Sequence, residues 1–155
     1  MGISITLTPI GEVIGGRIEL EDDAWGEVES VIRLNPQQCT EESLRGLEEF
    51  SHVEVIYYFH LVGDEKIEFG SRHPRGREDW PLVGILAQRA KDRPNRLGVT
   101  ICELVGVNGL EITLRGLDAI NGTPVLDVKP WMQEFSARGT VKEPAWAGEL
   151  MRNYW

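Results

Sequence analysis

The chain has 155 residues, of which 41% are hydrophobic and 26% charged, and its formal net charge is −9 at pH 7. This length predicts one domain, residues 1–155, that buries its own hydrophobic core. The acidic balance argues against general affinity for nucleic acid, and no apolar run approaches the roughly 20 residues that a membrane span needs. Since the N-terminus has no basic region followed by an apolar block, we expect a cytoplasmic protein with reduced cysteines.

The first half of the chain predicts strands on both sides of an acidic loop. Residues 3–7 alternate apolar with polar side chains, and we expect a strand that ends before Pro9. Residues 28–34 are rich in β-branched side chains and predict a second strand, after an acidic loop over residues 19–29. A short helix is expected after Thr40, because a good N-cap is followed there by two glutamates and an apolar face.

The second half predicts more strands. Residues 53–62 are aromatic and β-branched, which favours a central strand buried on much of both faces. Residues 82–88, 97–107 and 125–128 predict further strands, and Asn108-Gly109 predicts a hairpin between residues 99–107 and 110–115. The sequence therefore predicts a mainly β protein: a compact β-barrel of about six or seven strands with one or two short helices. Residues 132–155 would form a C-terminal extension, with a possible short helix over residues 146–151.

Basic side chains are concentrated in one segment. Residues 66–100 carry eight basic and four acidic side chains, whereas residues 1–65 carry three and fourteen. Prolines and glycines interrupt residues 70–95 and set turns there. One interpretation is a solvated surface of ion pairs, and the other is a shaped site for an anion. The density of charge in a segment with so many turns favours the second.

The usual motifs of nucleotide and metal sites are missing from the sequence. It has neither a G-x-G-x-x-G fingerprint nor a P-loop, and the three histidines do not show the spacing of zinc ligands, so no metal is predicted. His60 falls within a predicted strand, which favours a hydrogen-bonded structural histidine over a catalytic one. Cys102 lies in an alternating apolar run and is predicted to be a small core residue.

Two longer motifs carry the strongest functional signal. In the first, residues 87–100, Arg89 and Arg93 enter a proline-stiffened turn, where guanidinium groups can bind a carboxylate or phosphate through two hydrogen bonds. A plain turn with solvated charges explains this motif equally well. In the second, residues 116–131, Asp118 and Asp127 flank an Asn-Gly turn, and local turn chemistry explains Asn121 better than it explains Asp127.

At these motifs the chain resembles a known family. AQRAKDRPNRLGVT, from residue 87, is similar to the ATRS…RPNPIG…S signature of the TsaA-like (TrmO-type, YaeB-like) S-adenosylmethionine-dependent tRNA methyltransferases. LDAINGTPVLDVKPW, from residue 117, is similar to that family's LD…DGTPV.DIKPY signature, and PIGEV and LEEFSHVEVIYYFH resemble further family segments. The resemblance implies a β-barrel that binds S-adenosylmethionine without a Rossmann fold, between the subunits of a homodimer. The family activity is N6-methylation of threonylcarbamoyl-adenosine beside the tRNA anticodon.

Motif position also implies roles for single residues. The resemblance implies that the cofactor contacts Trp25, Gly26, His60, Arg89, Val99, Asp118, Asn121, Gly122 and Thr123. Substrate-facing residues are expected to include Arg93, Asn95 and Lys129 from the motifs and Arg72, His73 and Arg75 from the basic segment. No catalytic residue is identified.

The sequence departs from the family signatures at four positions, Gln88, Arg96, Asn121 and Trp131. With the charge of −9, these departures leave two alternatives open for the function. The first is a methyltransferase of the same fold that acts on a small molecule or a protein. The second is a non-catalytic module that binds an anion or a partner.

Overall fold

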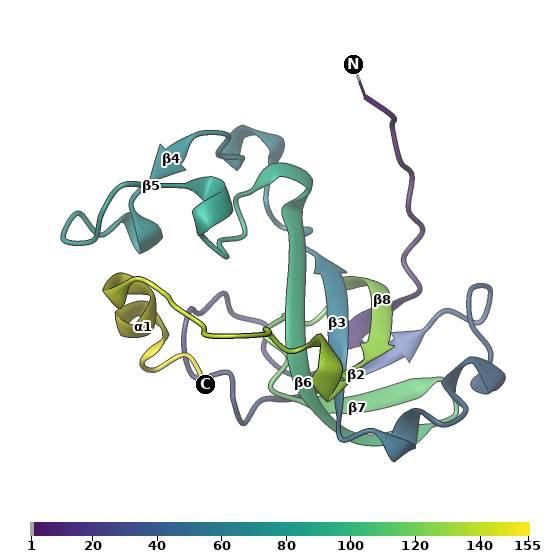
Figure 1. The fold of residues 1–155 in the computed structure, drawn as a ribbon. Coiled ribbons are helices and arrows are strands. Elements are labelled where there is room, and N and C mark those ends of the chain that lie inside the picture. Colours follow the sequence, from purple (N-terminus) through teal and green to yellow (C-terminus); the bar gives the residue numbers. More distant parts are fainter. Residues whose placement is uncertain (1) are drawn as a thin grey trace.

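Six antiparallel strands close into a barrel in the computed structural model, which describes residues 2–155 (Figure 1). The order around the barrel is β1 (Gly11–Ile14), β2 (Glu29–Leu34), β7 (Glu111–Arg115), β6 (Leu97–Asn108), β3 (His52–Tyr58) and β8 (Pro124–Pro130). β8 pairs with both β3 and β1, which closes the ring. The predicted mainly β fold with a compact barrel is confirmed.

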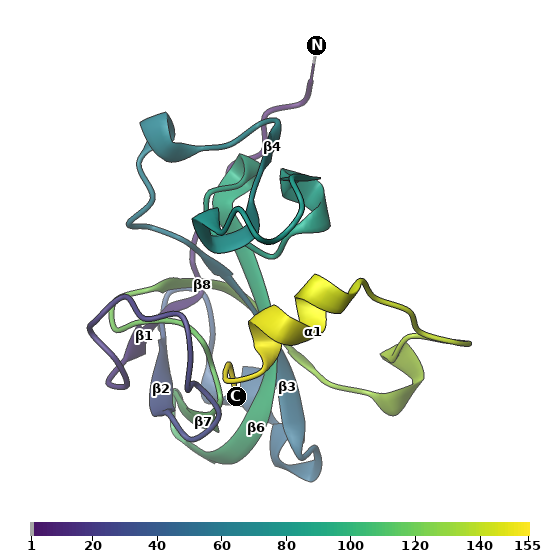
Figure 2. The same ribbon diagram turned by 90° about the vertical axis from the view of Figure 1, so that its left-hand side faces the viewer.

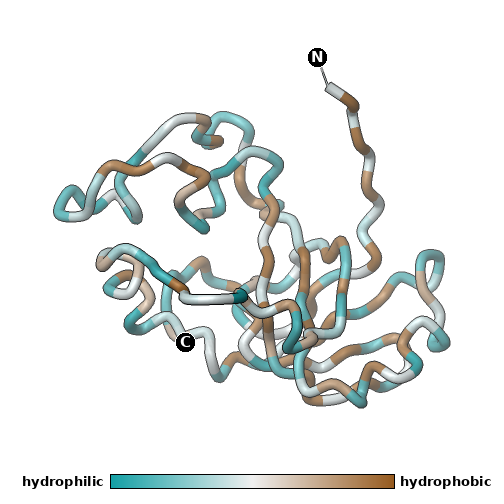
Figure 3. Tube along the Cα trace, in the orientation of Figure 1, coloured by the Kyte–Doolittle hydropathy of each residue, from teal (hydrophilic) through white to brown (hydrophobic). Residues whose placement is uncertain are grey.

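Alternation along the strands builds the core, because successive side chains of a strand point to opposite faces. In β3, Val53, Val55 and Tyr57 are buried, while the residues between them are partly exposed. β3 is a central strand, as predicted, with β6 and β8 as neighbours, but only one of its faces is fully buried, and it ends at Tyr58 rather than at residue 62. Cys102 is 3% exposed and belongs to the core, as predicted. The hydropathy colouring shows brown, apolar positions recurring along the barrel strands (Figure 3).

The hairpin predicted at Asn108-Gly109 is confirmed. Asn108 pairs with Glu111, and Gly109 has a φ of 60°, which is in the left-handed region that glycine adopts without strain. Further along the hairpin, the register shifts between Leu104 and Gly106. β6 pairs with β3 along Leu97–Glu103 and with β7 along Glu103–Asn108, on opposite edges, and the irregularity lies within the pairing with β7.

Three predicted elements take other forms. The expected helix after Thr40 is two short 3-10 helices, Glu41–Leu44 and Leu47–Glu49, because Gly46 between them adopts a left-handed φ of 85°. Residues 3–7 are not part of any sheet of the described chain, and Ile3 is 92% exposed. Residues 82–88 contain only the two-residue strand β5 (Val83–Gly84), followed by a 3-10 helix, Ile85–Ala87.

Residues 62–96 form a second layer beside the barrel, which we call the platform. Its short strand β4 (Ser71–Arg72) pairs with β5, and further 3-10 helices complete it: Asp64–Lys66, Pro74–Gly76 and Pro94–Arg96. After β8 come a 3-10 helix, Gln133–Phe135, an exposed linker over residues 136–144 and the helix α1 (Ala145–Met151), which confirms the second predicted helix. Figure 1 shows α1 opposite the platform, with the barrel beside both. None of the helices described in residues 2–155 is long and apolar enough to cross a membrane.

Candidate functional site

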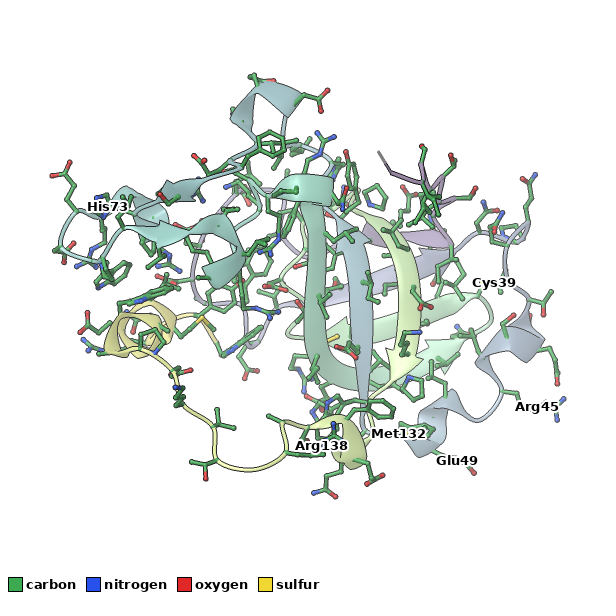
Figure 4. All side chains as sticks on the ribbon, turned by 45° about the horizontal axis from the view of Figure 1, so that its top comes forward. Cys39, Arg45, Glu49, His73, Met132 and Arg138 are labelled. Carbon is green, nitrogen blue, oxygen red and sulfur yellow. The ribbon has the colours of Figure 1, made fainter. Side chains whose placement is uncertain are left out.

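A cleft of about 1750 Å³ opens between the mouth of the barrel and the platform. The acidic loop, residues 19–29, and the C-terminal residues 144–155 contribute the remaining walls. Sites for small ligands usually measure about 300–1,000 Å³, so this cleft is larger than one small ligand needs. The cleft lies toward the platform end of the molecule, where His73 is labelled, and away from Arg45 and Glu49 at the other end (Figure 4).

The carboxylate of Asp118 accepts hydrogen bonds from hydroxyl groups of three other elements. Tyr57 of β3 donates to Asp118 Oδ1 at 3.0 Å, and Thr100 of β6 donates to the same oxygen. Tyr154, after α1, donates to Asp118 Oδ2. β7 delivers Asp118 to this position, because the turn at Gly116 takes a φ of 84° and Leu117 is fully buried behind it. The result is a charged group held at the barrel mouth.

The charge of this carboxylate affects the groups around it. Burial, and then the negative charge of Asp118, raise the pKa of Tyr57 and of Tyr154 far above the usual tyrosine value. Both phenols therefore stay protonated at physiological pH and remain hydrogen-bond donors. The same two causes, burial first, raise the pKa of the Cys102 thiol to about 12. Cys102 is accordingly unsuited to act as a nucleophile.

Gly98 on β6 determines where the ring of Tyr57 lies. The two residues are direct partners in the sheet, and a Cβ atom on Gly98 would lie 2.5 Å from two atoms of that ring. The ring of Phe59 packs edge-on against Tyr57, with the ring centroids 5.4 Å apart. Because both contacts fix the phenol, they also fix the hydroxyl that binds Asp118.

The first sequence motif, residues 87–100, forms the wall of the cleft that faces Asp118. Arg89 Nη2 donates to the carbonyl oxygen of Val99 at 2.6 Å, and Arg93 Nη1 donates to that of Gln88, also at 2.6 Å. After Pro94, Asn95 has a left-handed φ of 64°, so the turn is tight. The motif thus holds two guanidinium groups at defined positions beside β6.

Many of the basic side chains of the platform are paired with acids. Arg72 pairs with Asp92 at 2.7 Å, and Arg75 pairs with Asp23 of the acidic loop at 2.9 Å. Arg77 and Arg96 are also in ion pairs, so this part of the basic segment resembles the salt-bridged surface that was the first interpretation. Among the described residues, the platform's remaining basic side chains make no ion pair: Lys66, Arg89, Lys91 and Arg93.

The structure brings most of the expected cofactor residues together. Those that line the cleft are Trp25, His60, Arg89, Val99, Asp118 and Thr123. Gly26, Asn121 and Gly122 do not line it. Asn121 Oδ1 accepts a hydrogen bond from the backbone N–H of Gly15 at 3.0 Å, so its partner is 106 positions away rather than in its own turn, which its sequence context favoured. The roles of these residues remain predictions.

Some of the expected substrate residues line the cleft and others do not. Arg72, Arg75, Arg93 and Asn95 line the cleft, whereas His73 and Lys129 do not. His73 Nδ1 is 2.7 Å from the carbonyl oxygen of Trp80, and Lys129 pairs with Asp127 at 2.8 Å on β8. A substrate that contacts Lys129 would have to extend along the outside of the barrel.

The three hydroxyl groups that bind Asp118 were missed by the sequence analysis. Tyr57 and Thr100 are inward-facing positions of alternating strands, and that alternation is the signal that could have found them. Tyr154 has no such signal, because it follows a short helix in a mixed tail. In residues 2–155, no group of three or more His, Cys, Asp or Glu side chains is arranged to hold a metal ion.

The fold and the cleft place this chain in a class: it is a β-barrel domain with a ligand-binding cleft at the mouth of the barrel. The family model of the tRNA-methyltransferase O N-terminal domain matches residues 21–137. The chain belongs to this family, which confirms the resemblance found in the sequence.

Individual relatives agree with this assignment. The tRNA (adenine(37)-N6)-methyltransferase of Homo sapiens is 39% identical over 113 residues, which are 73% of this chain and 25% of the human protein. A probable S-adenosyl-L-methionine-binding protein of Methanothermobacter thermautotrophicus is 30% identical and is covered over 97% of its length, with 88% of this chain. A crystal structure of TrmO from Pseudomonas aeruginosa has a TM-score of 0.70 and 26% identity, over 90% of this chain and 62% of that one. The chain thus spans about a quarter of the human relative.

Proposed function

We propose that this chain is an S-adenosylmethionine-dependent methyltransferase that methylates N6 of threonylcarbamoyl-adenosine beside the anticodon of a tRNA. The observation that carries the proposal is the cleft itself, in which the Asp118 carboxylate and the Arg89 guanidinium are fixed at the barrel mouth of a chain of this family. Relatives with this domain are named tRNA (adenine(37)-N6)-methyltransferases.

The residues of the cleft fit the chemistry of the methyl donor. S-adenosylmethionine carries positive charge on its sulfonium and amino groups, a carboxylate and an aromatic base. Asp118 offers a fixed negative charge, Arg89 offers a guanidinium for the carboxylate, and the rings of Trp25 and Phe59 offer stacking surfaces. When bound, the donor supplies an activated methyl group.

The residues of the chain would act mainly by positioning. Methyl transfer is an in-line displacement, so most of its acceleration can come from holding donor and acceptor in alignment. The hydroxyls of Tyr57 and Thr100 restrain Asp118, and the Val99 carbonyl restrains Arg89. The side of the cleft toward Arg93 and Lys91 then remains for the acceptor.

We also propose that two copies of the chain form a homodimer with the cleft near their interface, and that tRNA is the partner. The support for the dimer is apolar surface on β6 beside the cleft, where Leu97, Ile101 and Val105 are 40–47% exposed. Burial of such surface in a dimer is favourable at about 25 cal/mol per Å². Light scattering with size-exclusion chromatography measures the oligomeric state directly.

The proposed function is tested in two stages. Isothermal titration calorimetry with S-adenosylmethionine should show saturable binding that is weakened in Asp118→Ala. Incubation with tRNA from cells that lack this modification should then add one methyl group to threonylcarbamoyl-adenosine, which nucleoside mass spectrometry detects. Failure of the donor to bind the intact protein would contradict the enzyme proposal and would favour a non-catalytic binding module.

A second candidate function is a methyltransferase that acts on a small molecule or a protein. Two observations favour it: the net charge is −9, and four arginines of the platform are already in ion pairs. Affinity for tRNA depends on basic groups that are available to phosphates. Donor binding without methyl transfer to any unmodified tRNA would support this candidate over the first.

A further inference from the structure

The C-terminal residues 145–155, which we call the strap, lie across the cleft and contact both of its sides. Asn153 and Tyr154 accept backbone hydrogen bonds from Ala24 and Trp25 of the acidic loop, at 2.9 and 2.7 Å. On the other side, Trp80 of the platform donates to Glu149 Oε2 at 2.7 Å. Figure 2 shows α1 and the C-terminal end in front of the barrel, on the side of the platform.

The strap is held by these polar contacts more than by burial. No residue of α1 is fully buried, and the linker that precedes it, residues 136–144, is exposed throughout. The strap also lies outside residues 21–137, the part that the family model matches. The match to the family model therefore does not describe the contribution of the strap to the cleft.

Tyr154 is the strap residue that reaches the fixed charge. Of the two carboxylate oxygens of Asp118, Oδ1 is held by Tyr57 and Thr100 of the barrel, and Oδ2 is held by Tyr154. The terminal torsion of an aspartate is broad, so a carboxylate held through one oxygen retains rotational freedom. Tyr154 removes that freedom, because its hydroxyl holds the second oxygen.

We propose that Tyr154 is a positioning residue: its hydroxyl fixes the Asp118 carboxylate toward the sulfonium of the methyl donor, and the strap forms one wall of the donor site. This inference rests on the proposed function, because it assumes that the cleft binds S-adenosylmethionine. It predicts that the strap contributes to recognition of the sulfonium charge more than to recognition of the rest of the donor.

The test compares two ligands on the intact protein. S-adenosylmethionine and S-adenosylhomocysteine differ by the transferred methyl group, and only the first carries the sulfonium charge. Calorimetry on Tyr154→Phe should show binding of S-adenosylmethionine weakened about tenfold, as expected for loss of a hydrogen bond to a charged group. Binding of S-adenosylhomocysteine should change by less than about twofold. Tyr58→Phe removes a hydroxyl from a ring that packs under Arg96 instead, and serves as the matched control.

A double-mutant cycle with Asp118→Asn separates positioning from packing. If Tyr154 acts through Asp118, Tyr154→Phe should have little further effect on donor affinity in the Asp118→Asn protein. Equal weakening of both ligands by Tyr154→Phe, or unchanged affinity for S-adenosylmethionine, would overturn the inference while leaving the proposed function intact. If neither ligand binds the unmodified protein, the proposed function itself fails.

Discussion

The hydroxyl of Tyr57 lies 3.0 Å from Asp118 Oδ1 and 3.2 Å from the backbone carbonyl oxygen of the same residue, although the two residues are 61 positions apart in the sequence. One phenol thus contacts both the side chain and the backbone of the loop that follows β7. Because Tyr57 is 2% exposed, this contact ties the charged group of the cleft to the hydrophobic core.

Removal of this hydroxyl should cost stability. We expect Tyr57→Phe to lower the free energy of unfolding by about 1–3 kcal/mol, since its loss leaves Asp118 without one charge-assisted donor. Urea denaturation followed by circular dichroism measures the change. The neighbouring substitution Tyr58→Phe should change stability by less than about 0.5 kcal/mol. Equal effects of the two substitutions would contradict this account of Tyr57.

Gly98 should be intolerant of a side chain. In Gly98→Ala the new methyl group would meet the Tyr57 ring at 2.5 Å, so the ring must move and carry its hydroxyl away from Asp118. We expect a loss of about 1–3 kcal/mol in stability, the usual cost of overpacking, together with weaker donor binding. Gly106→Ala is the matched control on the same strand, because a Cβ atom there has no neighbour within 4 Å. Similar melting temperatures for the two variants would refute the steric argument.

The two cysteines should differ in reactivity. The pKa of Cys102 is raised to about 12, so on the order of one thiol in ten thousand is ionised at pH 8, and Cys102 is also 3% exposed. Cys39 is only partly buried and should react first with iodoacetamide. Peptide mass spectrometry after brief labelling should find the adduct on Cys39 in the native protein and on both residues in urea. Early native labelling of Cys102 would show that the barrel opens readily.

Stability should fall in alkaline solution because of the two tyrosines at Asp118. Their pKa values are raised in the folded state, so the unfolded chain binds fewer protons above a pH of about 10. The stabilisation is complete below that pH and is lost as pH rises toward the folded pKa values. Urea midpoints measured from pH 8 to pH 11 should decline at the upper end, and the decline should be shallower in Tyr154→Phe. A decline of unchanged steepness in that variant would mean that Tyr154 titrates normally in the folded protein.

The proposed tRNA substrate should bind through the basic residues of the platform that make no ion pair. We expect Lys91→Ala and Arg93→Ala to weaken tRNA binding and to reduce its dependence on salt concentration, because each removes a group that can contact a phosphate. Arg77→Ala is the control, since that guanidinium is paired with Asp79. Fluorescence anisotropy over a salt series measures the slope. If Arg77→Ala has as large an effect as Lys91→Ala, ion pairing does not determine which residues bind RNA.

How much of the fold could be predicted from the sequence depended on whether the signal was local. The Asn108-Gly109 hairpin depends on adjacent residues and was found, as was α1. The expected helix after Thr40 failed at one residue, because Gly46 takes a left-handed conformation that apolar periodicity does not report. The predicted strand over residues 82–88 failed since tertiary packing of the platform outweighs the β propensity of a short apolar run.

The parts of the candidate site that could be predicted are again those with a local signal in the sequence. Arg89 and Asp118 belong to motifs that can be recognised within a few residues, and both line the cleft. The partners of Asp118 come from β3, β6 and the strap, and no local pattern connects those segments. The ion pair between Arg75 and Asp23 is equally non-local, and it shows that a basic segment can be partly neutralised by distant acids.

The closed ring of six strands also limits how copies of this domain can associate. Within residues 2–155 the strands of the barrel form a closed ring, because β1 and β8 pair with each other at Gly11–Val125 and Glu12–Pro124. In the proposed homodimer, the copies would meet through side chains such as the exposed Ile101 and Val105 of β6. An interface of that kind would respond to single surface substitutions that leave the core of the barrel unchanged, so the proposed assembly could be altered without altering the fold.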